Sequence, residues 1–167
     1  MQKIMRRSKV KLNKISLSAA GALLVGGAIF YLSSPTKNAE ETISLQHKDS
    51  TIVESGEVVY AENCASCHGV VLEGQANWRQ RAAEGYLPAP PHDETGHTWH
   101  HPDSYLFLMT KYGIEKMIGR LYPNNMPAYE DKLTDDEIVA VLSYIKSTWS
   151  GRIQRHHDQI NAREKSN

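Results

Sequence analysis

The chain has 167 residues, enough for one ordinary domain with accessory segments. Its formal net charge is zero, but the charges are unevenly distributed. Residues 1–14 hold six Lys and Arg and no acid, whereas from Glu40 onward twelve Lys and Arg face nineteen Asp and Glu, a formal charge of −7. The chain is therefore a basic leader joined to an acidic body, and we expect no nucleic-acid partner.

Residues 15–32, ISLSAAGALLVGGAIFYL, carry no charge. As a helix they would cover ~27 Å, close to the ~30 Å hydrocarbon core of a bilayer. We therefore expect a single transmembrane anchor. Because basic flanks stay in the cytoplasm, residues 1–14 form a cytoplasmic leader. The body then lies on the periplasmic or outer side of the bacterial cytoplasmic (inner) membrane. A cleaved signal peptide is the alternative. The polar residues 33–51 are expected to form a linker.

Helical signals begin after this linker. Residues 54–63, ESGEVVYAEN, have apolar positions that fit one face of a short helix. A long loop rich in Gly, Pro and polar residues follows. Residues 101–113 then predict a helix with Pro102 in its first turn and its end at Gly113. Residues 114–121 predict a further short helical turn.

The clearest element is the last helix. Thr134 and Glu137 fit a capping box, and apolar residues recur from there to Trp149 at helical spacing. Residues 151–167 are polar and are expected to form a C-terminal tail, either frayed or a solvated helix. The pattern predicts an all-α domain over residues 52–150, with a core small enough to need a large apolar group inside it.

Both cysteines of the chain, Cys64 and Cys67, lie in the stretch NCASCHG, with His68 directly after the second. A redox disulfide of the thioredoxin type expects a βαβ pattern, which is absent. A structural zinc site needs four ligands, and no second ligand pair stands at the usual spacing. C-x-x-C-H is the signature of c-type haem attachment. We interpret the motif as two thiols that hold one haem, with His68 on its iron.

A sixth iron ligand is expected further along the chain. Three methionines follow the motif, and Met109 and Met117 lie in apolar helical settings that favour core packing. Met126 instead lies in the irregular loop YPNNMPAYEDKLT, eight residues before the capping box. A thioether on such a loop can face the iron while the loop closes over the ring.

Together these motifs resemble a class I c-type cytochrome. The resemblance covers about residues 53–149 and rests on the C-x-x-C-H motif after a helix, the Met126 loop and the terminal helix. It implies one covalently bound haem c, attached at Cys64 and Cys67, with His68 and Met126 as axial iron ligands. It also implies a class I fold in which the first and last helices cross, with Gly56, Tyr60 and Tyr144 at the crossing. A proline carbonyl within residues 88–91 would accept a hydrogen bond from the proximal imidazole.

The function implied is electron transfer without catalysis. The chain would carry single electrons between membrane or periplasmic redox proteins, such as a quinol-oxidising complex, a terminal oxidase or reductase, or a dehydrogenase. The acidic body suggests a partner with a basic face.

A histidine-rich loop departs from the family pattern. HDETGHTWHH holds His92, His97, His100 and His101 at a density that copper or zinc could use. One of these imidazoles could also replace Met126 on the iron. The alternative function is therefore a haem protein that binds a small ligand, or a copper-associated redox protein. Candidate donors to the haem propionates are Trp78, Arg79, Arg81 and Trp99.

Overall fold

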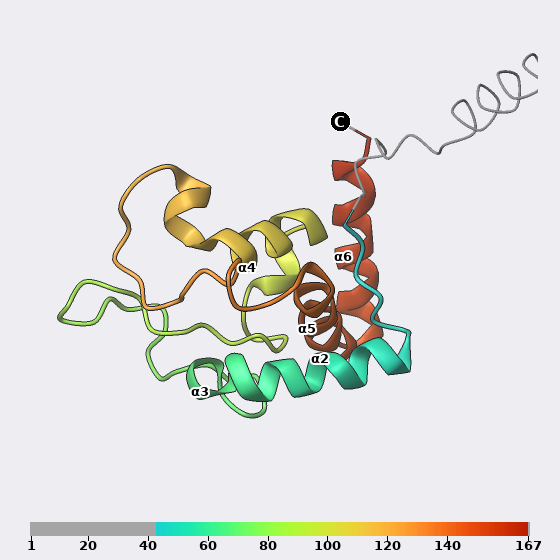
Figure 1. Ribbon diagram of the computed structural model, residues 1–167, viewed down its shortest axis with the longest axis horizontal. Coiled ribbons are helices and arrows are strands. Elements are labelled where there is room, and N and C mark those ends of the chain that lie inside the picture. Colours follow the sequence, from blue (N-terminus) through green and yellow to red (C-terminus); the bar gives the residue numbers. More distant parts are fainter. Residues whose placement is uncertain (1–42, 167) are drawn as a thin grey trace, which may run out of the picture. The chain divides into compact units, whose positions relative to one another are not determined.

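A computed structural model describes residues 43–166, and within that range it contains helices and no strands (Figure 1). The all-α prediction is confirmed for these residues. The elements are α2 (Ser50–Asn63), α3 (Ala65–His68), the 3-10 helix η1 (Thr98–His100), α4 (Asp103–Ile118), α5 (Asp135–Ser147) and α6 (Gly151–Glu164).

The predicted leader and the anchor at residues 15–32 lie outside the described residues, as does the first part of the linker. Within residues 43–166, no helix combines the length and the apolar character needed to cross a bilayer.

Helix α2 begins at Ser50, four residues earlier than predicted, because Asp49 caps it. The Asp49 carboxylate accepts the backbone N–H groups of Thr51 and Ile52 at 3.0 and 3.3 Å. Such a cap satisfies donors that the first helical turn leaves free. The residue before the helix therefore sets where it starts.

The described end of the predicted linker is packed on the domain. Leu45 is 7% exposed and belongs to the hydrophobic core. Its backbone N–H donates to Asp103 Oδ2 at 2.9 Å, and the N–H of Gln46 donates to Ser143 Oγ at 2.9 Å. The prediction of a polar linker as far as residue 51 was therefore wrong over residues 43–51. Ile43, which is partly buried, also packs against the core. Two apolar residues show too little periodicity to reveal this burial from sequence.

Helices α2 and α5 cross closely, as the resemblance implied. Gly56 lies against the backbone of α5, where a Cβ atom would overlap the carbonyl oxygen of Ala140. One turn further along α2, the rings of Tyr60 and Tyr144 lie 5.5 Å apart between centroids. The absence of a side chain at Gly56 thus sets how closely the two helices approach.

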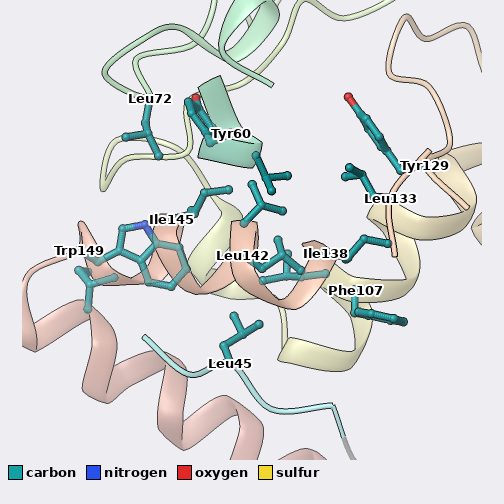
Figure 2. Packing of buried hydrophobic residues seen from close by; sticks show 14 residues of the cluster. Leu45, Tyr60, Leu72, Phe107, Tyr129, Leu133, Ile138, Leu142, Ile145 and Trp149 are labelled. Atoms are coloured by element: carbon teal, nitrogen blue, oxygen red, sulfur yellow. The ribbon is translucent and has the colours of Figure 1, made fainter. Parts of the chain in front are cut away.

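Helix α5 lies at the centre of the core (Figure 2). The predicted capping box is present, with Thr134 Oγ1 accepting the Glu137 N–H and Glu137 Oε2 accepting the Thr134 N–H. Figure 2 shows Ile138, Leu142 and Ile145 of α5 in one cluster with Leu45, Tyr60 and Phe107. The buried residues of α5 are Ile138, Ala140, Val141, Leu142, Ser143, Ile145 and Lys146.

Helix α4 follows the prediction in two steps. Gly113 has φ +77° and ψ 164°, so the helical backbone is interrupted there, where the sequence predicted an end. A short helical continuation then runs to Ile118 and ends at Gly119 with φ +67°. Both positions need a backbone conformation that glycine adopts without strain.

Residues 151–164 form the helix α6, one of the two forms expected for the C-terminal tail, but this helix packs on the domain instead of being fully solvated. Ile153 is 2% exposed and His157 is fully buried, with its ring edge-on to Trp149 at 5.2 Å. His157 Nε2 donates to the carbonyl oxygen of His101 at 2.8 Å. Their i, i+4 spacing places both buried residues on one face. Two isoleucines, Ile153 and Ile160, in an otherwise polar segment were too few to predict that face from sequence.

Polar contacts also join α6 to the helices beneath it. The Lys146 ammonium of α5 is almost fully buried and lies 2.6 Å from Asp158 Oδ1. The Asn161 amide pairs with Asp103 at the start of α4, accepting its backbone N–H at 2.7 Å and donating to Oδ1 at 2.9 Å. Helix α6 therefore supplies a counter-charge to α5 and a cap to α4.

Asp158→Ala tests the first of these contacts. It leaves the buried Lys146 ammonium without its partner, so we expect the free energy of unfolding to fall by about 1–3 kcal/mol. Adding Lys146→Met should recover most of the loss, because the buried charge is then gone. Urea unfolding measures both. An unchanged midpoint in Asp158→Ala would show that the ion pair does not contribute to stability.

His157 makes the fold sensitive to acid. Burial, followed by the nearby Lys146, lowers the pKa of His157 below its ordinary value of 6.5. The unfolded chain therefore binds a proton that the folded chain resists, and stability falls as the pH drops below about 6.5. One such proton gives a slope of up to about 1.4 kcal/mol per pH unit. In urea titrations between pH 5 and 8, His157→Gln should flatten this slope and the exposed neighbour His156→Gln should not. Equal slopes in the two variants would contradict the assignment.

Candidate functional site

The C-x-x-C-H motif lies where α2 ends. Cys64 directly follows α2, and residues 65–68 form the single turn α3, with the His68 N–H donating to the Cys64 carbonyl at 2.9 Å. Two tyrosine hydroxyls hold this segment. Tyr60 Oη donates to the Gly69 carbonyl and Tyr129 Oη to the Asn63 carbonyl, each at 2.8 Å. These hydrogen bonds fix the backbone directly before and directly after the motif.

Neither alternative use of the cysteines gains support. Cys64 and Cys67 are both free thiols. Burial, with a smaller contribution from Cys67, raises the pKa of Cys64 to about 11, so Cys64 stays protonated near neutral pH and is a poor partner for disulfide exchange. Within residues 43–166 no three His, Cys, Asp or Glu side chains are grouped so as to hold a metal ion.

His68 is oriented as a metal ligand would be. Its side chain is 7% exposed, and Nδ1 donates to the carbonyl oxygen of Pro90 at 2.8 Å. The structure thereby selects Pro90 from the prolines of residues 88–91. With the proton on Nδ1, Nε2 keeps its lone pair for a metal. Burial lowers the pKa of His68 despite this hydrogen bond, which further favours the neutral imidazole.

A cavity of about 400 Å³ adjoins the motif. Cys64, Cys67 and His68 line it on the motif side, and α4 and α5 supply apolar walls. This volume lies within the ~300–1,000 Å³ typical of cofactor pockets. The apolar wall residues are Leu106 and Ile114 of α4 and Val141, Leu142 and Ile145 of α5.

Two methionines line this cavity. Met126 does so from the predicted loop, and Met109 from α4; Met117 is not among the lining residues. The expectation that Met109 is a core-packing residue missed its position on the cavity wall. It stands one helical turn after Tyr105 and Leu106, which also line the cavity, so the i, i+4 spacing of that face was the available signal.

The Met126 loop is fixed close to the motif. Tyr129, three residues after Met126, is 7% exposed, and its hydroxyl reaches the Asn63 carbonyl just before Cys64. Its backbone N–H donates to the Lys111 carbonyl of α4 at 3.0 Å. Met126 itself is 36% exposed and lines the cavity.

Three of the four histidines in the histidine-rich loop line the cavity. His92, His97 and His101 line it and His100 does not. The His92 ring stacks on His68 with centroids 4.0 Å apart, and its Nδ1 lies 2.8 Å from Thr98 Oγ1. Sequence reasoning missed this contact because a stacking partner has no fixed spacing.

The four candidate propionate donors do not line the cavity. Arg79 lies over the Trp78 ring at 3.9 Å, and Trp99 Nε1 donates to the Glu94 carbonyl at 3.3 Å. Arg81 comes nearest, because Nη2 donates at 3.2 Å to the hydroxyl of Tyr122, which does line the cavity.

The residues present fit a covalently bound haem. Two free thiols, an imidazole with an open lone pair, a thioether and apolar walls surround one cavity. The family model for cytochrome c matches residues 53–149. The chain belongs to the cytochrome c family. Its cofactor is accordingly haem c, bound through the C-x-x-C-H motif.

Two curated relatives illustrate the range of this family. The chain is 32% identical over 99 residues to cytochrome c6 of Diacronema lutheri, covering 57% of this chain and 94% of the relative. It is 28% identical over 135 residues to a nitrite reductase of Stutzerimonas stutzeri, covering 77% of this chain but only 20% of that protein. No solved structure matches.

The stacking of His92 on His68 leads to a prediction for this cytochrome. His92→Leu removes the ring that lies parallel to the ligand imidazole, whereas His92→Phe keeps a flat ring. We expect the ligand plane to turn in the first variant and to hold in the second. The haem-methyl shifts of the ferric protein in proton NMR report that orientation. Equal shift changes in the two variants would show that stacking does not orient His68.

Proposed function

We propose that this chain is a monohaem electron carrier whose iron is held by His68 and Met126. The observation that supports it is that one cavity is lined by the two attachment cysteines, the oriented imidazole and the Met126 thioether. When bound, the haem supplies one iron that alternates between the ferric and ferrous states. Two axial protein ligands leave no open position for a substrate, so the proposal assigns no catalysis.

The protein residues would then act on the energetics of the iron. A neutral thioether favours ferrous iron more than an imidazole does, and apolar walls such as Leu106 and Ile145 disfavour the more highly charged state. The Pro90 carbonyl works in the opposite direction, because a hydrogen bond from Nδ1 makes His68 a stronger donor. Methionine ligation and an apolar cavity suit the oxidising end of an electron-transfer chain.

The proposed partners are redox proteins: a quinol-oxidising complex, a terminal oxidase or reductase, or a dehydrogenase. Similarity to a fifth of a protein named nitrite reductase is the reason to keep a reductase among the proposed partners. The proposal keeps residues 15–32 as an anchor in the bacterial cytoplasmic membrane, with the haem domain on the periplasmic or outer side.

Met126→Ala tests the axial assignment. It should abolish the ligand-sensitive near-infrared absorption of the ferric protein and open the iron to azide or cyanide. Met126→His should keep six ligands but lower the reduction potential. A tenfold change in the ferric–ferrous equilibrium corresponds to about 59 mV for one electron, so redox titration resolves a modest effect.

Met109→Ala is the matched control, because Met109 is the second thioether on the same cavity. It should keep the near-infrared absorption and change only packing. Loss of the band in Met109→Ala with its survival in Met126→Ala would move the ligand to α4. Azide binding by the unaltered protein would favour the alternative function, a haem protein with an open iron.

A further inference from the structure

A second cleft, of about 490 Å³, lies between η1 and α6. Trp99 and His100 line it from η1, and Arg152, Arg155, His156 and Gln159 line it from α6. The spacings between positions 152, 155, 156 and 159 of α6 are three and four residues, so these side chains share one helix face. The buried side chain of Ile153 also contributes to the lining.

The cleft differs in charge from the rest of the described chain. Residues 43–149 hold eight Lys and Arg and fifteen Asp and Glu, a formal charge of −7. Residues 150–166 hold four basic and two acidic residues, a formal charge of +2. Every charged or titratable side chain that lines the cleft is Arg or His, and no carboxylate lines it. An acidic domain thus has one concave basic site.

Neither arginine is engaged elsewhere among the described residues. No salt bridge or side-chain hydrogen bond there involves the guanidinium of Arg152 or Arg155. The carboxylate that interacts electrostatically with Arg152 is Glu94, whose Oε1 accepts the backbone N–H of Ser150 where α6 begins. That hydrogen bond is the main reason the pKa of Glu94 is lowered. Both guanidinium groups therefore keep their donors for a ligand.

The Trp99 ring is held in a fixed orientation at this cleft. It stacks on His100 with centroids 3.7 Å apart and meets His156 edge-on at 5.6 Å. Its neighbour Thr98 lines the haem cavity instead. The short helix η1 therefore contributes to both sites, and its Trp99 is a reporter for the cleft.

We propose that the η1–α6 cleft binds an oxyanion, either a phosphate group or paired carboxylates. Planar guanidinium groups donate two parallel hydrogen bonds to such oxygens, and the flanking imidazoles and the Gln159 amide add donors. Four of the polar lining residues of the cleft follow residue 149, where the family match ends. The proposal does not depend on the axial ligands of the iron.

The sequence provides an internal control for non-specific binding of anions to arginine. Arg79 also lies next to a tryptophan, over the Trp78 ring, but outside the cleft. Trp149 is 3% exposed and has its Nε1 bonded to the His92 carbonyl at 2.8 Å. The three indole N–H signals therefore separate cleft binding from surface binding and from a general change in structure.

The test is a titration of the reduced, haem-loaded full chain with inorganic phosphate against chloride at equal ionic strength. Indole N–H signals are followed by two-dimensional NMR, and calorimetry gives the affinity. We expect the Trp99 signal to shift saturably with phosphate while those of Trp78 and Trp149 stay in place. The double variant Arg152→Gln/Arg155→Gln should bind at least tenfold more weakly, and Arg79→Gln should bind as the unaltered chain does.

A second titration, with hexaglutamate peptide, distinguishes the sources of the oxyanion. Saturable binding of phosphate alone indicates a small phosphate ligand, and preferential binding of the peptide indicates the acidic segment of a partner protein. Either result supports the cleft if the double variant loses it. Parallel, unsaturated shifts of Trp78 and Trp99, equal binding by the double variant, or no Trp99 shift with either anion would overturn the proposal.

Discussion

The close approach of α2 to α5 at Gly56 is the constraint on which the haem site depends. Because Gly56 has no side chain, α2 lies against the Ala140 carbonyl. The end of α2 then brings Cys64 and the turn that follows it to the cavity. Helix α5 supplies an apolar wall of the same cavity through Val141 and Ile145. A side chain at this position would force the helices apart, and the thiols would move relative to that wall.

The long loops around the cavity are positioned by hydrogen bonds to their carbonyl groups rather than by regular structure. The Pro90 carbonyl accepts from His68, the His92 carbonyl accepts from Trp149, and the His101 carbonyl accepts from His157. Loop residues lack the regular backbone hydrogen bonds of helices and sheets, so their buried carbonyl groups need side-chain donors as partners. Here side-chain donors from the motif, from Trp149 after α5 and from α6 do so, which ties residues 90–101 to the helices at three points.

The sequence predicted the parts of this protein that have a local signature. The capping box at Thr134 and the C-x-x-C-H motif depend on residues within five positions of each other, and both are present as expected. Contacts between segments that are distant in the sequence could not be predicted from such local patterns. The choice of Pro90, the stacking of His92 on His68 and the burial of Leu45 depend on how loops fold over helices, and side-chain type alone does not determine that.

Helix α6 shows why the C-terminal residues belong to the domain. The family match ends at residue 149, yet Lys146 and Trp149, both within the match, contact helix α6 beyond it. Lys146 is an unusual residue for a buried helix face, since an unpaired ammonium there would be costly. It is accommodated because Asp158 of α6 lies 2.6 Å away, and Trp149 likewise meets the buried His157 ring. In this chain α5 therefore serves two surfaces: its apolar side lines the haem cavity, and its Lys146 side depends on α6. The basic face that α6 presents next to η1 is thus attached to the same helix that borders the haem.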